Sequence, residues 1–72
     1  MKFYVVLYQD LWLNSSKVSQ EGYQYLWQAQ KFCKSQLKWD EYPDNPALYE
    51  RNGHVYGNSI TKQKYTIVEV TV

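Results

Sequence analysis

The pattern of apolar and polar positions predicts a β-strand at each end of the chain. Residues 2–9 are rich in β-branched and aromatic side chains, and residues 64–72 have the same character. Residues 2–9 are apolar on both faces, which is typical of a strand inside a sheet. Both segments are apolar enough to be central, so we expect them to be neighbours in the sheet. If they run parallel, the segment between them would form a right-handed crossover.

A helical period follows the first strand. Ser19 can act as an N-cap, and the residues after it are good helix formers as far as about Lys38. The side predicted to face solvent carries Trp27, Lys31, Lys34 and Lys38. The side predicted to pack on the sheet follows the i, i+3, i+4 spacing and consists of Tyr25, Leu26, Ala29, Phe32, Cys33 and Leu37.

Turn-forming residues then divide the second half of the chain. Pro43 and Pro46 end the helix, because proline cannot donate a backbone hydrogen bond. Asn52-Gly53, between strand-like residues 47–51 and 54–56, predicts a hairpin with a type I′ turn, whose two central residues both need a positive φ.

Two further breaks are predicted. Residues 57–59 (Gly-Asn-Ser) form one, and residues 14–16 (Asn-Ser-Ser) form the other. Between the first strand and this second break, Trp12 and Leu13 could extend a hairpin.

These elements predict an α+β fold in a single compact domain spanning residues 1–72. One helix packs on a three- or four-stranded, mostly antiparallel sheet, in the order β-α-β-β or β-α-β-β-β. A helix on one face leaves the other face of the sheet open, and we expect Tyr4, Tyr8 and Tyr65 to occupy that open face.

Composition adds a functional prediction. The chain has 13 aromatic residues among 72, eight of them Tyr and three Trp. A sheet with one helix has limited interior, so we expect a contiguous Tyr/Trp patch at the surface, where such side chains favour protein contacts. The predicted partner-binding residues include three lysines that would steer toward an acidic surface; the full set is Trp12, Tyr23, Trp27, Lys31, Lys34, Lys38 and Trp39.

Charge and cysteine content exclude several classes of function. Eight basic and seven acidic residues give neither the positive field of a dedicated duplex-DNA binder nor the acidic surface of a DNA mimic. One cysteine and one histidine exclude an intramolecular disulfide and thiolate or histidine metal clusters, so no metal or cofactor is expected.

Catalysis and membrane insertion are not expected either. The carboxylates follow no catalytic motif, and Cys33 lies on the apolar side of the predicted helix, so we predict a non-enzymatic protein. The chain contains neither an apolar run of about 20 residues nor a recognisable export signal. A cytoplasmic protein without a membrane partner is therefore predicted.

The layout of the chain resembles that of small accessory proteins of tailed bacteriophages over nearly its whole length. The stretches that carry this resemblance are Phe3–Tyr8, the helical residues 25–33, and the final strand with Tyr65-Thr66-Ile67-Val68-Glu69-Val70. The resemblance implies a small effector in the bacterial host cytosol that binds a host protein, such as a defence nuclease, and blocks it sterically. It transfers no functional residues, because that class of protein shares no site motif.

Two alternatives remain open at the level of sequence. Trp27 and the three lysines after it could bind single-stranded nucleic acid weakly, by stacking and by phosphate contacts. The chain could also be a self-associating structural protein, in which the open face of the sheet pairs with a second copy.

Overall fold

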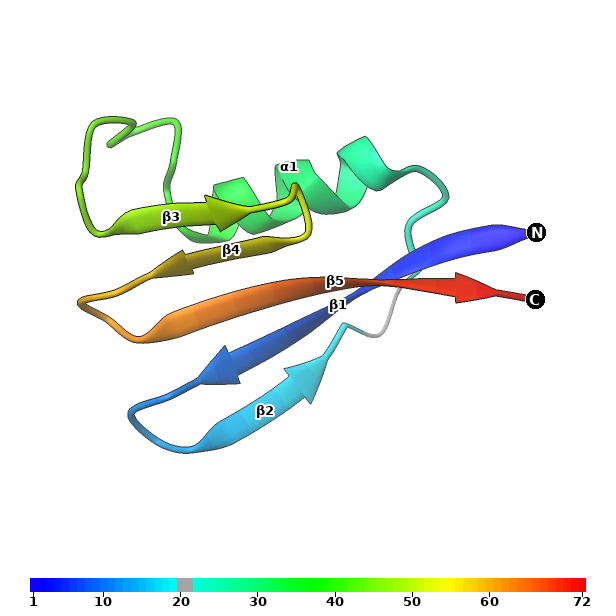
Figure 1. Cartoon of the computed structure of the whole chain (residues 1–72), viewed down its shortest axis with the longest axis horizontal. Helices are drawn as coiled ribbons and strands as arrows, with labels where there is room; N and C mark the ends of the chain where they lie inside the picture. The colour runs from blue at the N-terminus through cyan, green and yellow to red at the C-terminus, as the bar shows by residue number, and fades with distance from the viewer. Residues whose placement is uncertain (20–21) are drawn as a thin grey trace.

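The computed structural model describes residues 1–19 and 22–72. One sheet contains all five strands, in the order β2-β1-β5-β4-β3, and every pairing is antiparallel. The only helix among the described residues lies against one face of the sheet, behind the strands in Figure 1. The predicted α+β fold, one helix on an antiparallel sheet, is confirmed. The elements in chain order are β1 (Lys2–Asp10), β2 (Ser15–Val18), α1 (Leu26–Gln36), β3 (Leu48–Arg51), β4 (Val55–Asn58) and β5 (Gln63–Thr71).

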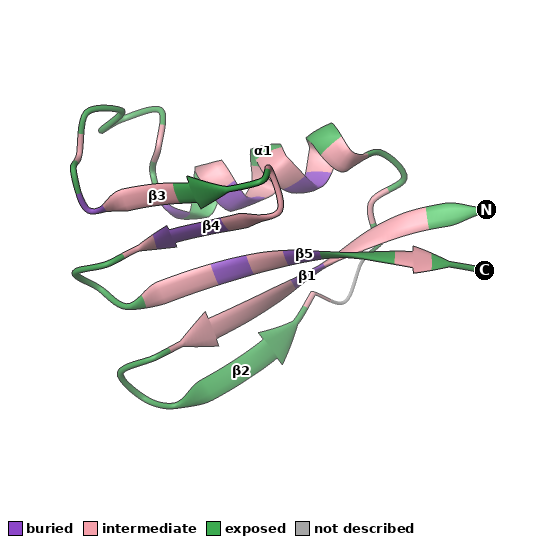
Figure 2. Cartoon of the chain, in the orientation of Figure 1, coloured by how far each residue is buried: buried purple, intermediate pink, exposed green. Residues whose placement is uncertain are grey.

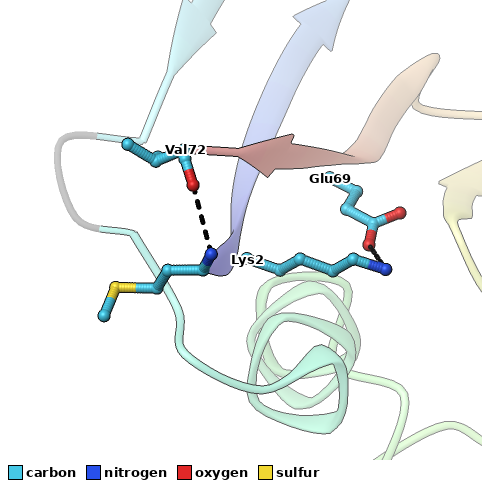
Figure 3. A network of polar contacts seen from close by, with 4 residues as sticks. Lys2, Glu69 and Val72 are labelled. Carbon is cyan, nitrogen blue, oxygen red and sulfur yellow. Dashed lines mark hydrogen bonds and ion pairs between the residues drawn. The ribbon is translucent and has the colours of Figure 1, made fainter.

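The two terminal strands are neighbours, as predicted, but they run antiparallel. β1 and β5 pair over nine residues each, so the helix is not a parallel crossover. This pairing brings the chain ends together (Figure 3): the Met1 ammonium donates to the Val72 carbonyl oxygen at 3.1 Å. Lys2 Nζ lies 3.2 Å from Glu69 Oε1, an exposed ion pair that contributes at most about 1 kcal/mol.

The number of strands was underestimated, because two predicted breaks lie partly within strands. Residues 15–16 belong to β2, and the turn before them is residues 11–14. Residues 57–58 belong to β4, and the turn after them is residues 59–62. Ser, Gly and Asn have weak intrinsic strand preference, but a neighbouring strand to pair with overrides it.

The helix begins later than predicted. α1 starts at Leu26, because the residue predicted to cap it pairs with β1 instead. The Ser19 N–H donates to the Val6 carbonyl oxygen at 2.8 Å, and Ser19 Oγ accepts from the Val6 N–H at 3.0 Å. Residues 20–21, also predicted as helical, lie outside the described residues.

The core lies between α1 and the middle of the sheet, as the buried segments in Figure 2 show. Tyr25 departs from the predicted helix stripe, because its side chain is about half exposed at the start of α1. The remaining members of the stripe are buried or half-buried. The buried core residues that pack together are Val6, Ala29, Cys33, Leu37, Tyr56, Tyr65 and Ile67.

The tyrosines predicted for the open face lie on the helix side. Directly paired residues share a face of the sheet, and Tyr8 pairs with Tyr65, which pairs with Tyr56. The Tyr8 and Tyr65 ring centroids are 4.9 Å apart, and Phe32 of α1 meets Tyr65 edge-on at 6.3 Å. Tyr4 also packs against this core. The sequence did not reveal which face was covered, because both faces of β1 are apolar.

The predicted Asn52-Gly53 turn is confirmed. Both residues have a positive φ, 55° and 68°, and the His54 N–H donates to the Arg51 carbonyl oxygen at 3.0 Å. The Gln30 side-chain amide of α1 donates to the Gly53 carbonyl oxygen at 2.9 Å, which ties this hairpin to the helix.

Gly57 makes room for an aromatic ring on the neighbouring strand. A Cβ at this position would lie 2.4 Å from Cζ of Tyr49, its direct partner on β3. We expect Gly57→Ala to lower the free energy of unfolding by about 1–2 kcal/mol, because the ring must move. In a Tyr49→Ala background the same change should be neutral or stabilising, because alanine restricts the unfolded chain more than glycine does. Urea unfolding of the wild type, the two single variants and the double variant measures how far the effect of Gly57→Ala depends on the Tyr49 ring. An equal loss of stability in both backgrounds would contradict the contact between the two residues.

Candidate interaction surface

Two turns built in the same way lie side by side at one end of the sheet. The β1–β2 turn (residues 11–14) follows Asp10, and the β4–β5 turn (residues 59–62) follows Asn58. Asp10 Oδ1 accepts from the backbone N–H groups two and three positions later, at 3.0 and 3.2 Å. Asn58 Oδ1 does the same, at 2.9 and 3.1 Å. These side chains fix both turns, because they satisfy backbone donors that the strands leave unpaired.

The two turns are also bonded to each other. The last residue of each turn has a left-handed φ, which is 53° at Asn14 and 61° at Lys62. The Leu11 N–H donates to the Lys62 carbonyl oxygen at 2.9 Å, and Trp12 Nε1 donates to the Ile60 carbonyl oxygen at 3.3 Å. Trp12 and Ile60 occupy equivalent positions in their turns, so the indole of one turn rests against the backbone of the other.

Four large apolar side chains protrude from these paired turns. Leu11 is 53% exposed, Trp12 69%, Leu13 76% and Ile60 71%. We call these four residues the turn cluster. Their backbone is already held by hydrogen bonds, so binding through them costs little ordering of the chain. Exposed apolar side chains that lie close together on the surface typically mark a site of contact with another molecule.

The sequence predicted only Trp12 of this cluster. Leu11, Leu13 and Ile60 were missed, although Asp10 and Asn58 at the ends of apolar strands are the usual start of such turns. The two turns become neighbours only because β1 pairs with β5, which is a long-range contact.

Three other predicted binding residues come together at a different place. Tyr23, Trp27 and Lys31 line one open groove along α1, together with Phe32. Trp27 is 59% exposed, and it lies at the start of the helix, toward the chain ends in Figure 1. The paired turns lie at the opposite end of the sheet, so Trp12 and Trp27 belong to separate surfaces.

Of the remaining predicted residues, Lys34 joins Trp27 and Lys31 in a neighbouring open groove on α1, whereas Lys38 and Trp39 line neither groove. Lys34 Nζ lies 5.9 Å from the centre of the Tyr56 ring, in a cation–π contact. Trp39 is half-buried and meets the same ring edge-on at 6.0 Å, so it packs with the core instead of standing exposed. Lys38 is exposed, beyond the end of α1.

The prediction of one contiguous Tyr/Trp patch is wrong. The exposed rings are Trp12, Tyr25, Trp27 and Tyr42, and within the described part of the chain none of them contacts another of the four. The other rings are buried or half-buried. Beneath the helix, Tyr8, Tyr65, Phe32 and Tyr23 contact one another in turn, and Trp39 meets Tyr56. The sheet therefore accommodates more aromatic side chains than the chain length suggested.

The described residues offer little catalytic chemistry. Burial of Cys33, whose side chain is fully enclosed, raises the pKa of the thiol to about 12, so it is neutral and unreactive at pH 7. Residues 1–19 and 22–72 contain no group of three metal-ligating side chains. Within the same residues, the single helix is too short to cross a bilayer.

Comparisons with known proteins were made at the level of family, sequence and structure. No protein-family model matches the chain, and neither the curated proteins nor the solved structures gave a match.

Proposed function

We propose that this chain is a small non-enzymatic protein-binding module that docks the turn cluster against a partner protein. The observation that supports this proposal is the exposure of Leu11, Trp12, Leu13 and Ile60 on two turns held rigid by hydrogen bonds. Protein interfaces draw most of their affinity from a few such desolvated anchors. The resemblance to phage accessory proteins extends the proposal to a modulator of a host protein, such as a defence protein, that acts by steric contact in the host cytosol.

Trp12 is the expected anchor of this contact. Its indole N–H already has an acceptor in the Ile60 carbonyl oxygen, so burying the ring in a partner would leave no polar group unsatisfied. The remaining ring surface is apolar and exposed, and Leu11 and Leu13 flank it in the same turn.

The test is capture of a partner from bacterial lysate, followed by a binding titration with the purified partner. We expect Trp12→Ala to weaken binding by about 30-fold, because truncation of a true anchor costs about 2 kcal/mol or more. Tyr42→Ala is the matched control, since Tyr42 is an exposed aromatic residue in another loop. Circular dichroism should show both variants folded. Equal affinity for the wild type and Trp12→Ala would refute docking through the turn cluster.

A second function, weak binding of single-stranded nucleic acid, is supported by the groove beside Trp27. An exposed indole next to the Lys31 ammonium is the arrangement that stacks on a base and contacts its phosphate. This function predicts oligonucleotide binding that weakens steeply with added salt and is lost in Trp27→Ala. A flat titration at low ionic strength would eliminate it.

A further inference from the structure

The face of the sheet turned away from α1 is apolar at its centre. Direct pairs share a face, so the pair Val5–Val68 lies opposite to Val6 and Ile67, which pack beneath the helix. None of the described elements packs on this side. We call its apolar and aromatic residues the open face: Phe3, Val5, Leu7, Val18, Tyr49, Val55, Val68 and Val70.

Thr66 on β5 is a polar residue among the apolar ones, since it pairs with both Leu7 and Val55, whereas the charged residues lie toward the rim of the open face. Lys64 is four residues from Val68 along β5, a distance of about 13 Å at the rise of an extended strand. Arg51 is on the edge strand β3, two strands away from β5. No carboxylate is carried on this side by the strands of the described chain, because Asp10, Glu50 and Glu69 point to the helix side. An apolar centre with a polar rim is the arrangement of a specific protein interface.

We propose that the open face of a second copy of this chain covers this one, in a two-fold dimer of sheet packed on sheet. Aliphatic residues of two such faces can interdigitate at the usual spacing of about 10 Å between stacked sheets. With the Val5–Val68 pair at the centre of the contact, the basic residues Arg51 and Lys64 stay at its edge, in reach of solvent.

The size of the face fits a weak dimer. The two longer dimensions of the molecule, 36 and 26 Å, lie in the plane of Figure 1, where the sheet is seen face-on. The sheet fills only part of this outline: its 30 strand residues, at about 3.3 Å along a strand and about 4.8 Å between strands, cover roughly 480 Å². This is less than the roughly 800 Å² per partner of a standard interface, so we expect a weak dimer. A small domain also gains from a second apolar contact, because a chain near this size buries only about 60% of its unfolded surface.

Pairing through the edges of the sheet is the less favourable way to dimerise. The edge strands β2 and β3 have four residues each, so a continuous sheet across two copies would gain few hydrogen bonds. Face-to-face packing uses instead the long central strands β1 and β5, which carry most of the open face.

This dimer goes beyond the proposed function and uses none of the residues of the turn cluster. The turn cluster lies at the end of the sheet beyond Lys64, so both copies can present it while the open faces are in contact.

Sedimentation velocity over roughly a hundredfold range of concentration, up to about 1 mM, tests the proposal. We expect a monomer–dimer equilibrium for the wild type. Val68→Lys should weaken the dimer about tenfold or more, because a two-fold contact buries the new charge twice. Val68 is 42% exposed in the single copy, so the lysine can reach water in the monomer. If Val68→Lys fails to fold, Val18→Lys, at a position 60% exposed on β2, replaces it.

The matched control is Ile60→Lys, which places the same charge in the turn cluster and should leave the dimer unchanged. A wild-type chain that stays monomeric at about 1 mM overturns the proposal, and so does a dimer that resists Val68→Lys but dissociates in Ile60→Lys. Loss of a captured partner in Val68→Lys, with a monomeric wild type, would mean that another protein covers the open face. Trp12→Ala tests the proposed function separately, since it should weaken binding of the partner protein without changing the dimer.

Discussion

We expect replacement of Tyr56 by alanine to remove about 3–5 kcal/mol from the free energy of unfolding. The Tyr56 side chain is 1% exposed in the middle of the core, where it contacts Trp39 edge-on and the Lys34 ammonium over its face. Alanine would leave a cavity between the sheet and α1 that the surrounding rings cannot fill. At about 0.05–0.15 kcal/mol per residue, a domain of 72 residues is stable by roughly 4–11 kcal/mol, so the variant should lose a large share of its stability and unfold at a much lower urea concentration.

Urea unfolding followed by circular dichroism measures this loss. Tyr56→Phe keeps the ring, and we expect it to cost less than about 1.5 kcal/mol. Tyr42→Ala removes a tyrosine that is 60% exposed, and we expect a change within about 0.5 kcal/mol. A Tyr56→Ala variant as stable as Tyr42→Ala would mean that the ring does not hold the core together.

We also expect the fold to lose several kcal/mol of stability as the pH rises from about 9 to about 12. Burial raises the pKa of the Cys33 thiol from 9.0 to about 12. Burial, followed by the charges of Tyr8 and Cys33, raises the pKa of Tyr65 from 10.0 to about 12. Both groups are neutral when protonated, so the folded chain keeps protons that the unfolded chain releases in this range. Their contribution is fully present below pH 9 and is lost as the pH rises through the folded-state pKa values, at about 1.4 kcal/mol for each pKa unit.

The measurement is the free energy of unfolding by urea at a series of pH values from 7 upward. Cys33→Ala and Tyr65→Phe each remove one ionisable group, so each variant should show a shallower decline between pH 9 and pH 12 than the wild type. The variants are compared by the slope of the free energy of unfolding against pH, because each substitution also changes the stability at neutral pH. A wild-type curve that is flat across this range would contradict the assignment of the two groups to the core.

Local sequence patterns were most reliable where a single segment determines the structure. The Asn52-Gly53 turn follows from two residues that tolerate a positive φ, and the strand character of β1 and β5 follows from their β-branched and aromatic side chains. Local patterns were less reliable where another segment competes. Ser19 has the chemistry of a helix cap, yet its hydrogen bonds go to Val6 of β1, and α1 begins only at Leu26.

The predicted binding residues show the same contrast between what one segment determines and what distant segments decide. Trp12 was predicted to bind because the chain has more large aromatic residues than a small domain was expected to enclose, and the structure exposes it. Trp39 was predicted on the same ground, but the Tyr56 ring covers part of it. Composition cannot separate these two tryptophans, because exposure depends on which distant residues pack against each ring.

By itself, the sequence determined the class of the fold, the absence of a disulfide within the chain, and the positions of the longest strands. These properties depend on residue types and on spacing within one segment. Tertiary structure alone decided that β1 and β5 pair antiparallel, which puts two distant turns side by side and leaves the aliphatic face of the sheet uncovered by the described elements. Both faces of β1 are apolar, so only the docking of α1 on one of them distinguishes the core from the surface.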